Sequence, residues 1–315
     1  MVHQGAPKLN SVLCLGGANV DRKLRSTGPL QMGTSNPARQ QESMGGVARN
    51  VAENLARLGL KVSLMTVVGD DAAGRALLAH VASLGIHTGA SLQLAGQSTG
   101  SYTALLDLQG ELLLAMAAMD LCEAITPTFL EQNRAQWLHA SLIVADLNLP
   151  RATLQAVVES ARRSATPLVM VAVSAPKMTH LPLDLNGVSV LVLNRDELAA
   201  LAGVALPTLR GMGAACAKLR QRGARDVVVT LGAKGVVHTD GVELRRLAAP
   251  KVKVLDVTGA GDAFSAGLCW SLIQRPQDLH LACQRGLALA AMTLQCEAAV
   301  SPDINPTVLL DIGQC

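Results

Sequence analysis

The strongest constraint on the fold is a regular alternation of apolar runs and helical stretches that begins at Pro127. Helices are expected over residues 127–137 and 151–163, and strands over residues 142–145, 168–173 and 188–193. Strands that are apolar on both faces are typical of a parallel sheet covered by helices on each side. Ligands bind beyond the carboxyl ends of such strands, where Asp146, Asn148 and Ser174 lie. The alternation therefore predicts an α/β fold with a ligand site at one edge of the sheet.

The composition limits the class of protein. Half of the 315 residues are apolar and 16% are charged, so a large core can form. The net charge is +3, with no basic run longer than a pair, which argues against nucleic-acid binding. Seven cysteines without a Cys-x-x-Cys pair favour free thiols in a reducing compartment. No apolar stretch approaches the roughly 18 residues of a membrane span. We expect a cytoplasmic protein with a polar tail over residues 1–10 and one domain over residues 11–315.

A glycine-rich stretch at residues 256–262, Asp-Val-Thr-Gly-Ala-Gly-Asp, precedes a helical run and follows β-branched residues at 252 and 254 that predict a strand. Gly259 and Gly261 permit a tight turn, and the free N–H groups at the start of a helix favour an anion such as phosphate. Asp262 is either an ordinary helix cap or a general base that accepts a proton from an attacking hydroxyl. Together these features predict phosphoryl transfer to an alcohol.

Two segments near the N-terminus carry polar residues in ligand-binding positions. Asn19 and Asp21 follow a buried strand at residues 11–16 and alternate, so in an extended chain both side chains point the same way. An Asx turn would use the same two residues. Gly45 and Gly46 open a helix that carries Asn50, and paired glycines let a ligand approach the backbone.

Two later segments are candidates for nucleotide and metal binding. Asn194 and Glu197 follow the strand at residues 188–193, where a capping box and a Mg²⁺ ligand are alternative interpretations. A glycine loop at residues 231–235 follows an expected strand at residues 226–230. The remaining expected elements are a strand at 61–68, a helix at 72–84, a hairpin at 99–106 and 111–116, and helices at 208–223 and 279–294.

In this order the motifs resemble those of the PfkB (ribokinase-like) carbohydrate kinases, from about residue 12 to about residue 302. The resemblance implies a three-layer α/β/α sandwich with a central, mostly parallel sheet and a small β-sheet lid formed by about residues 20–44 and 98–118. It implies an ATP- and Mg²⁺-dependent kinase in which Asp262 is the catalytic base. The N–H groups of Gly259, Ala260 and Gly261 would form an anion hole.

The resemblance also implies roles for individual residues. The acceptor would be bound by Asn19, Asp21, Asn36, Gly45, Gly46, Arg49 and Asn50. ATP would be bound by Asn194, Thr230, Gly232, Gly235 and Thr258. Glu197 would bind Mg²⁺. Asp256 and Thr258, together with the loop at residues 296–301, would hold a monovalent cation, K⁺. Val171 and Ala172 replace an Asp-Pro that is frequent in the family, which could shift nucleotide or substrate preference.

The acceptor is predicted from two segments, Ser35-Asn36-Pro37 and residues 45–56, which resemble the branch of the family that acts on pseudouridine. The resemblance implies 5′-phosphorylation of this nucleoside, and other nucleosides, sugars and sugar phosphates remain alternatives. Asn36 or a lid carbonyl could accept from the extra ring N–H of pseudouridine, and Tyr102 is a candidate stacking surface.

Rival functions and partners also follow from the sequence. An oxidoreductase would require a Gly-x-Gly-x-x-Gly turn, which is missing. A non-catalytic sensor is disfavoured by the presence of Asp262. An exposed apolar face on the small sheet predicts a homodimer formed through the lid. Neither a nucleic acid nor a membrane is expected as a partner.

Overall fold

The computed structural model describes residues 11–241 and 243–312 and confirms the α/β class. Its main sheet has the strand order β14-β13-β12-β11-β10-β9-β1-β4. The strands are β1 (Ser11–Leu15), β4 (Lys61–Met65), β9 (Leu142–Asp146), β10 (Leu168–Val171), β11 (Val190–Asn194), β12 (Asp226–Thr230), β13 (Val236–Asp240) and β14 (Glu243–Leu247). The strands from β4 to β12 run parallel, whereas β13 and β14 are each antiparallel to the preceding strand.

Helices cover both faces of the main sheet because successive strand side chains point to opposite faces. In β1, Val12 and Cys14 belong to one apolar core, and Leu13 and Leu15 belong to the other. The first core is closed by α1 (Val47–Arg57), α8 (Ala260–Gln274), α9 (Leu279–Thr293) and α10 (Thr307–Leu310). The second is closed by α3 (Pro127–Gln132), α5 (Arg151–Ser164), α6 (Arg195–Ala202) and α7 (Leu209–Gln221). This three-layer arrangement places the strand ends, where ligands bind in such sheets, between the two helical layers.

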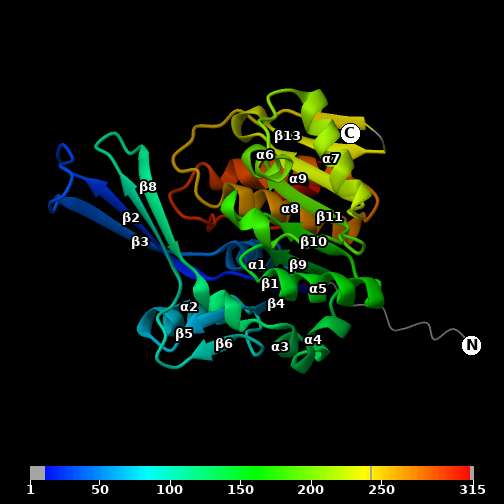
Figure 1. Cartoon of the computed structure of the whole chain (residues 1–315), viewed down its shortest axis with the longest axis horizontal. Helices are drawn as coiled ribbons and strands as arrows, with labels where there is room; N and C mark the ends of the chain where they lie inside the picture. Colours follow the sequence, from blue (N-terminus) through cyan, green and yellow to red (C-terminus); the bar gives the residue numbers. More distant parts are fainter. Residues whose placement is uncertain (1–10, 242, 313–315) are drawn as a thin grey trace, which may run out of the picture.

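A second sheet projects from one side of the main body (Figure 1). It has the order β3-β2-β7-β8, with β2 (Asn19–Ser26), β3 (Ala38–Gly45), β7 (Ser101–Leu106) and β8 (Leu112–Ala118). The family resemblance assigned about residues 20–44 to the β-sheet lid, but the residues themselves predicted no strand, because residues 22–44 are polar and rich in Ser, Gly, Pro and Gln. Most of β3 is exposed, so no buried apolar face marks it as a strand. The sheet matches the two ranges expected for the lid, except that β2 begins one residue earlier, at Asn19, and β3 ends one residue later, at Gly45. Its closure over a substrate stays a prediction.

Three expected elements differ from the prediction. The strand at 61–68 breaks at Thr66, whose hydroxyl donates to the Gly16 carbonyl at 2.6 Å. The chain continues as β5 (Val67–Gly69), which pairs with β6 (Leu92–Leu94) and is followed by α2 (Ala72–Ser83). The helix at 127–137 is interrupted after Gln132 and resumes as α4 (Ala135–Leu138). The strand expected at 252–254 is wrong: this segment is irregular, and the Leu255 N–H donates to the Leu294 carbonyl of the α9 C-cap rather than to a strand.

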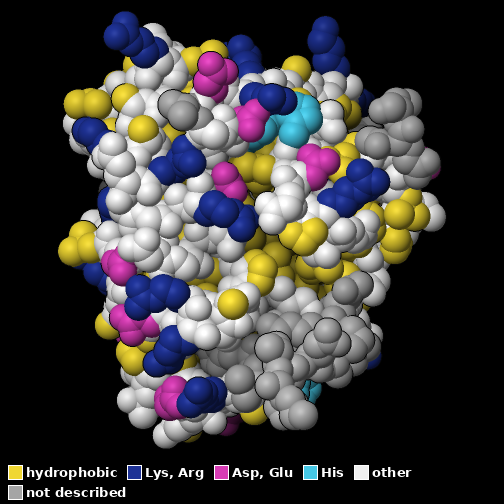
Figure 2. All heavy atoms as spheres, turned by 90° about the vertical axis from the view of Figure 1, so that its right-hand side faces the viewer, with side chains coloured by type: hydrophobic (Ala, Val, Ile, Leu, Met, Phe, Trp, Pro, Cys, Tyr) yellow, Lys and Arg dark blue, Asp and Glu magenta, His cyan; other side chains and the backbone are white. Residues whose placement is uncertain are grey.

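Short 3-10 helices complete the described chain, at Asp120–Ala124, Pro176–His180 and Gly232–Lys234. Within residues 11–241 and 243–312, no helix is long and apolar enough to cross a membrane. Figure 2 shows one face on which Lys and Arg side chains alternate with Asp and Glu rather than gathering into a basic patch. The described cysteines are free, and all except Cys296 are buried; Cys315 lies outside the described residues.

Candidate active site

The glycine-rich stretch forms the start of α8, as its composition predicts. Gly259 is the N-cap residue and has a φ of 77°, in the left-handed region that favours glycine. A Cβ on Gly259 would lie 1.9 Å from the Ala299 carbonyl oxygen, so this position has no room for a side chain. The N–H of Ala260, expected in the anion hole, instead donates to the Val257 carbonyl at 3.3 Å, whereas within the described chain the N–H groups of Gly261 and Asp262 have no hydrogen-bond acceptor. These donors, together with the positive end of the helix dipole, form a site suited to an anion.

Asp262 lies in the first turn of α8 and is held by α1. Its Oδ2 accepts a hydrogen bond of 2.6 Å from the Asn50 side-chain amide. Burial raises the pKa of Asp262 to about 7. The bond from Asn50 opposes this rise, while the carboxylate of Asp146 adds to it. A carboxyl group with a pKa near neutrality can both accept and release a proton at physiological pH, as a general base must.

Arg49 was expected to bind the acceptor, and the structure bonds its guanidinium to protein groups while its charge acts on Asp262 and Asp21. The side chain is buried, with an exposed fraction of 3%, and its Nη1 lies 2.6 Å from Glu53. The remaining guanidinium donors contact the carbonyls of Met44 and Gly45 and the amide oxygen of Asn50. Because its donors are used within the protein, Arg49 orients the Asn50 amide, whose N–H then points to Asp262.

Asn19 and Asp21 lie on β2 and do point the same way, as their alternation predicts. The Asn19 amide donates to Asp21 Oδ1 at 2.6 Å, and burial raises the pKa of Asp21. A Cβ on Gly45 would lie 2.3 Å from the Asp21 carboxylate, and one on Gly46 would lie 2.4 Å from the Gly17 carbonyl. The paired glycines therefore admit the neighbouring chain, which brings Asp21 to the start of α1.

Asp146 is a positioning residue that the sequence showed only as a polar residue at a strand end. It is fully buried at the end of β9. Its Oδ2 accepts from the backbone N–H groups of Gly17 and Ala48, each at 2.9 Å. Its Oδ1 accepts from the Asn148 N–H at 2.8 Å. One carboxyl group thus joins the loop after β1 to the first turn of α1, which fixes Asn50 relative to β2.

A cavity of about 520 Å³ opens beside the free N–H groups of α8. It brings together three of the expected nucleotide residues, Thr230, Gly232 and Gly235, with Ala260 and Gly261 of the expected anion hole. Its apolar wall comes from Phe264 of α8, from α9 and its C-cap residue Leu294, and from Val252, Val254 and Val257. The volume is typical of a pocket for a small organic ligand. Asn194 and Thr258 do not line it, although Asn194 lies opposite Thr230 in the sheet register.

Asn194 and Glu197 form the capping box that was one of the two interpretations. The Asn194 side chain accepts from the backbone N–H groups of Asp196 and Glu197, and Glu197 Oε2 accepts from the Asn194 N–H at 2.6 Å. Burial raises the pKa of Glu197. The described residues contain no cluster of three metal-binding side chains. Mg²⁺ on a nucleotide needs only one or two carboxylates, so the second oxygen of Glu197 fits a water-mediated role, which stays a prediction.

Asp256 and Thr258, expected to hold K⁺, are both contacted by the ammonium group of Lys23 from β2. Lys23 Nζ contacts Asp256 Oδ2 and lies 2.8 Å from Thr258 Oγ1. Asp256 Oδ1 accepts from the Thr258 N–H at 2.9 Å and from the Thr258 hydroxyl at 2.7 Å. With Lys23 in this position, the two side chains do not fit an additional cation.

Asn36 lies away from the candidate site, whereas Tyr102 lies beside Asp21. The Asn36 amide is bonded to the backbone of Gln31 and Thr34 in its own exposed loop, at the outer end of the small sheet (Figure 1). It is therefore not brought to the site. Tyr102 is the cross-strand neighbour of Asp21 in the register of β2 and β7, and about a third of its surface is exposed. Its ring shares the face of Asp21, on which Lys23 also reaches the start of α8.

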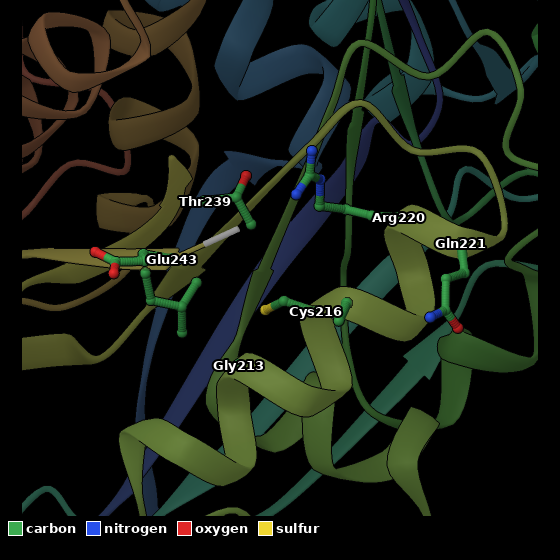
Figure 3. A pocket seen from close by; sticks show the side chains of 8 residues that line it. Gly213, Cys216, Arg220, Gln221, Thr239 and Glu243 are labelled. Carbon is green, nitrogen blue, oxygen red and sulfur yellow. The ribbon is translucent and has the colours of Figure 1, made fainter. Parts of the chain in front are cut away.

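A separate cavity of about 300 Å³ lies between α7 and the strands β13 and β14. Figure 3 shows its wall, formed by Cys216 and Arg220 of α7 and by Thr239 and Glu243 of the strands. Burial raises the pKa of the Cys216 thiol to about 11, so this thiol is not a nucleophile at neutral pH. The cavity contains none of the motifs at the strand ends and is not the candidate site.

Comparisons with known proteins bear on these features. The pattern of the pfkB family carbohydrate kinases matches residues 9–307. The chain is 34% identical over 310 residues to pseudouridine kinase of Escherichia coli (strain K12), which covers 96% of this chain and 97% of that protein. It is 27% identical over 289 residues to guanosine-inosine kinase of Exiguobacterium acetylicum, with 90% and 94% covered.

Solved structures agree in fold. A carbohydrate kinase from Agrobacterium tumefaciens has a TM-score of 0.79 and 32% identity, covering 96% of this chain and 97% of that chain. Arabidopsis thaliana ribokinase, complexed with ribose and ATP, has a TM-score of 0.81 over 96% and 98%, and at 19% identity it bears on the fold alone. The chain belongs to the pfkB family of carbohydrate kinases and is an ATP-dependent sugar or nucleoside kinase with a ribokinase-like fold.

Proposed function

We propose that this protein transfers the γ-phosphoryl group of ATP to the 5′-hydroxyl of pseudouridine. The observation that carries the proposal is the position of Asp262. Its side chain is hydrogen-bonded to Asn50 and interacts electrostatically with Asp21, and the preceding residue, Gly261, lines the 520 Å³ cavity. A base at the boundary between a nucleotide pocket and a hydroxyl-binding group is the arrangement that phosphoryl transfer to an alcohol requires.

The reaction follows from this arrangement. The ionised Asp262 accepts the proton of the 5′-hydroxyl, and the oxygen forms a bond to the γ-phosphorus as the bond to the β–γ bridging oxygen breaks, releasing ADP. The N–H groups of Gly261 and Asp262 donate to the charge that develops on the transferred group. Glu197 would hold Mg²⁺ through water, and the ion would neutralise charge on the phosphates. Asn19 and Asp21 bind the ribose hydroxyls.

The preference for a nucleoside over a free sugar is supported by Tyr102 and by the most similar of the named relatives. A ring next to Asp21 offers a stacking surface to a base, whereas ribose would leave it uncovered. Since the Asn36 amide is bonded within its own loop, we assign the acceptor for the pseudouridine ring N–H to a backbone carbonyl of the small sheet. A nucleoside lacking that N–H would leave a buried acceptor unpaired.

The test is kcat/KM with MgATP for pseudouridine, uridine, inosine, ribose and fructose 6-phosphate. We expect pseudouridine to give the highest value, and Asp262→Asn to lower kcat by about 10²-fold or more with every acceptor. A higher value for another acceptor would refute the substrate while leaving the kinase chemistry intact. Retained turnover in Asp262→Asn would refute the role of the base.

A homodimer formed through the small sheet is part of the proposal. Leu105 and Leu114 are paired in the register, and with Met116 they form an exposed apolar strip. Burying this strip against a second copy would remove apolar surface from water. Analytical ultracentrifugation of the wild type and of Leu114→Glu tests this, and two equal monomeric masses would refute it. The free cysteines suit a reducing compartment, which supports the proposed cytoplasmic location.

A further inference from the structure

Lys23 connects the small sheet to the loop that opens α8. Its ammonium group contacts the carboxylate of Asp256 and the hydroxyl of Thr258. The Lys23 and Asp256 side chains are only 22% and 20% exposed, so the pair is partly withdrawn from solvent. In the part of the chain that the structure describes, no other ion pair joins β2, β3, β7 or β8 to the main body.

The contact lies directly before the anion hole. Thr258 precedes Gly259, the left-handed residue from which α8 starts and exposes the N–H groups of its first turn. Asp256 holds Thr258 through both its backbone N–H and its hydroxyl. A cation at Asp256 therefore acts on the residue that fixes where those N–H groups point.

The cation also has an electrostatic role. Without it, the carboxylate of Asp256 would stand near a loop that receives a polyanionic nucleotide. The Lys23 ammonium group on β2 contacts this carboxylate and supplies its positive partner.

We propose that the Lys23 ammonium group is a built-in monovalent cation, which positions the anion-hole loop and makes K⁺ unnecessary for catalysis. Lys23 is a positioning residue, since it acts through Asp256 and Thr258 rather than on the reacting atoms. The proposal rests on the kinase activity of the site and is independent of which acceptor is phosphorylated. It replaces the expectation of K⁺ at the same two side chains.

The first test compares the wild type with Lys23→Met, using the best acceptor of the panel. Buffers contain either KCl or tetramethylammonium chloride at equal ionic strength. We expect the wild type to have the same kcat in both salts. Lys23→Met should lose about 10- to 100-fold in kcat in tetramethylammonium chloride, because a displacement of about 1 Å can cost 10²-fold, and KCl should restore most of the loss.

The matched control is Arg22→Met, which removes a cation from the position of β2 directly before Lys23. Arg22 pairs with Glu42 inside the small sheet, so its loss should create no dependence on K⁺. A second readout needs no turnover: KCl should raise the Tm of Lys23→Met above its value in tetramethylammonium chloride, and should leave the wild type unchanged.

Three results would overturn the proposal. The first is a wild-type enzyme that requires K⁺. The second is Lys23→Met with full activity in the absence of K⁺. The third is a folded Lys23→Met whose lost activity and Tm do not respond to K⁺, which would mean that the lysine acts as an ordinary structural contact. Failure of pseudouridine as the substrate would leave the salt comparison unaffected.

Discussion

Replacing Asp262 by asparagine removes an ionisable group from the site while keeping the shape of the side chain. The asparagine oxygen can still accept the hydrogen bond that Asn50 donates. In the folded wild type, burial raises the pKa of Asp262 from 3.8 to about 7. The native state therefore binds this proton more tightly than the unfolded chain does. Its contribution to stability is complete below pH 3.8 and is lost progressively as the pH rises to about 7.

The size of the loss can be estimated from the difference in pKa. The rise in the pKa of Asp262 from 3.8 to about 7 corresponds to an upper limit of about 4 kcal/mol in the free energy of unfolding. Solvent reaches part of the Asp262 side chain, so we expect about 1 to 2 kcal/mol after screening. Asparagine has no charge to bury. Asp262→Asn should therefore be more stable than the wild type above neutrality, with a Tm higher by roughly 2–6 °C.

The assay is urea unfolding of the wild type and of Asp262→Asn across the pH range from about 5 to about 8.5. The difference between their unfolding free energies should grow as the pH rises. The control is Asp256→Asn, because hydrogen bonds hold the pKa of Asp256 below its ordinary value. That carboxylate contributes stability above its unfolded pKa, so its loss should destabilise the protein at neutral and alkaline pH. If Asp262→Asn were equally or less stable than the wild type at every pH, the burial argument for Asp262 would be refuted.

Three further predictions concern other residues. Tyr102→Ala should raise KM for a nucleoside by about tenfold, since stacking on a base is worth about 1–3 kcal/mol. It should change KM for ribose little, and equal changes for both acceptors would refute the stacking role. Gly259→Ala should cost at least about 2 kcal/mol in unfolding free energy and most activity, because a Cβ meets the Ala299 carbonyl in a left-handed conformation; wild-type behaviour in both measurements would contradict the loop geometry. Glu197→Gln should raise the Mg²⁺ concentration needed for half-maximal rate, and an unchanged titration would leave Glu197 as a cap alone.

Local chemistry made the main sheet and the start of α8 predictable from sequence. Buried strands such as residues 142–146 are continuous apolar runs, and Gly259 marks a turn that no other residue can make. The small sheet could be predicted only in part. Its β2 and β3 strands carry polar side chains that contact each other or solvent, so their pairing depends on partners distant in the sequence.

The roles within the site were harder to predict than its location. Arg49 has the composition of a substrate ligand, yet Glu53 and nearby carbonyls use its donors. Whether a guanidinium faces a substrate or its own helix depends on burial, which a motif does not encode. Lys23 gave no signal for the same reason, because its partners Asp256 and Thr258 are more than 230 residues away.

The electrostatics of the site explain why the ionised form of Asp262 lowers the stability of the fold. Burial is the main reason why the pKa of Asp262 is raised, the carboxyls of Asp146 and Asp21 add to the rise, and the buried cation of Arg49 opposes it. Arg49 also pairs with Glu53, and its charge does not cancel the effect of burial, so the pKa of Asp262 remains at about 7. A general base works best when its pKa is close to the operating pH. The burial that destabilises the ionised carboxylate above neutrality, with smaller contributions from Asp146 and Asp21, is therefore what gives Asp262 its affinity for the proton of the acceptor.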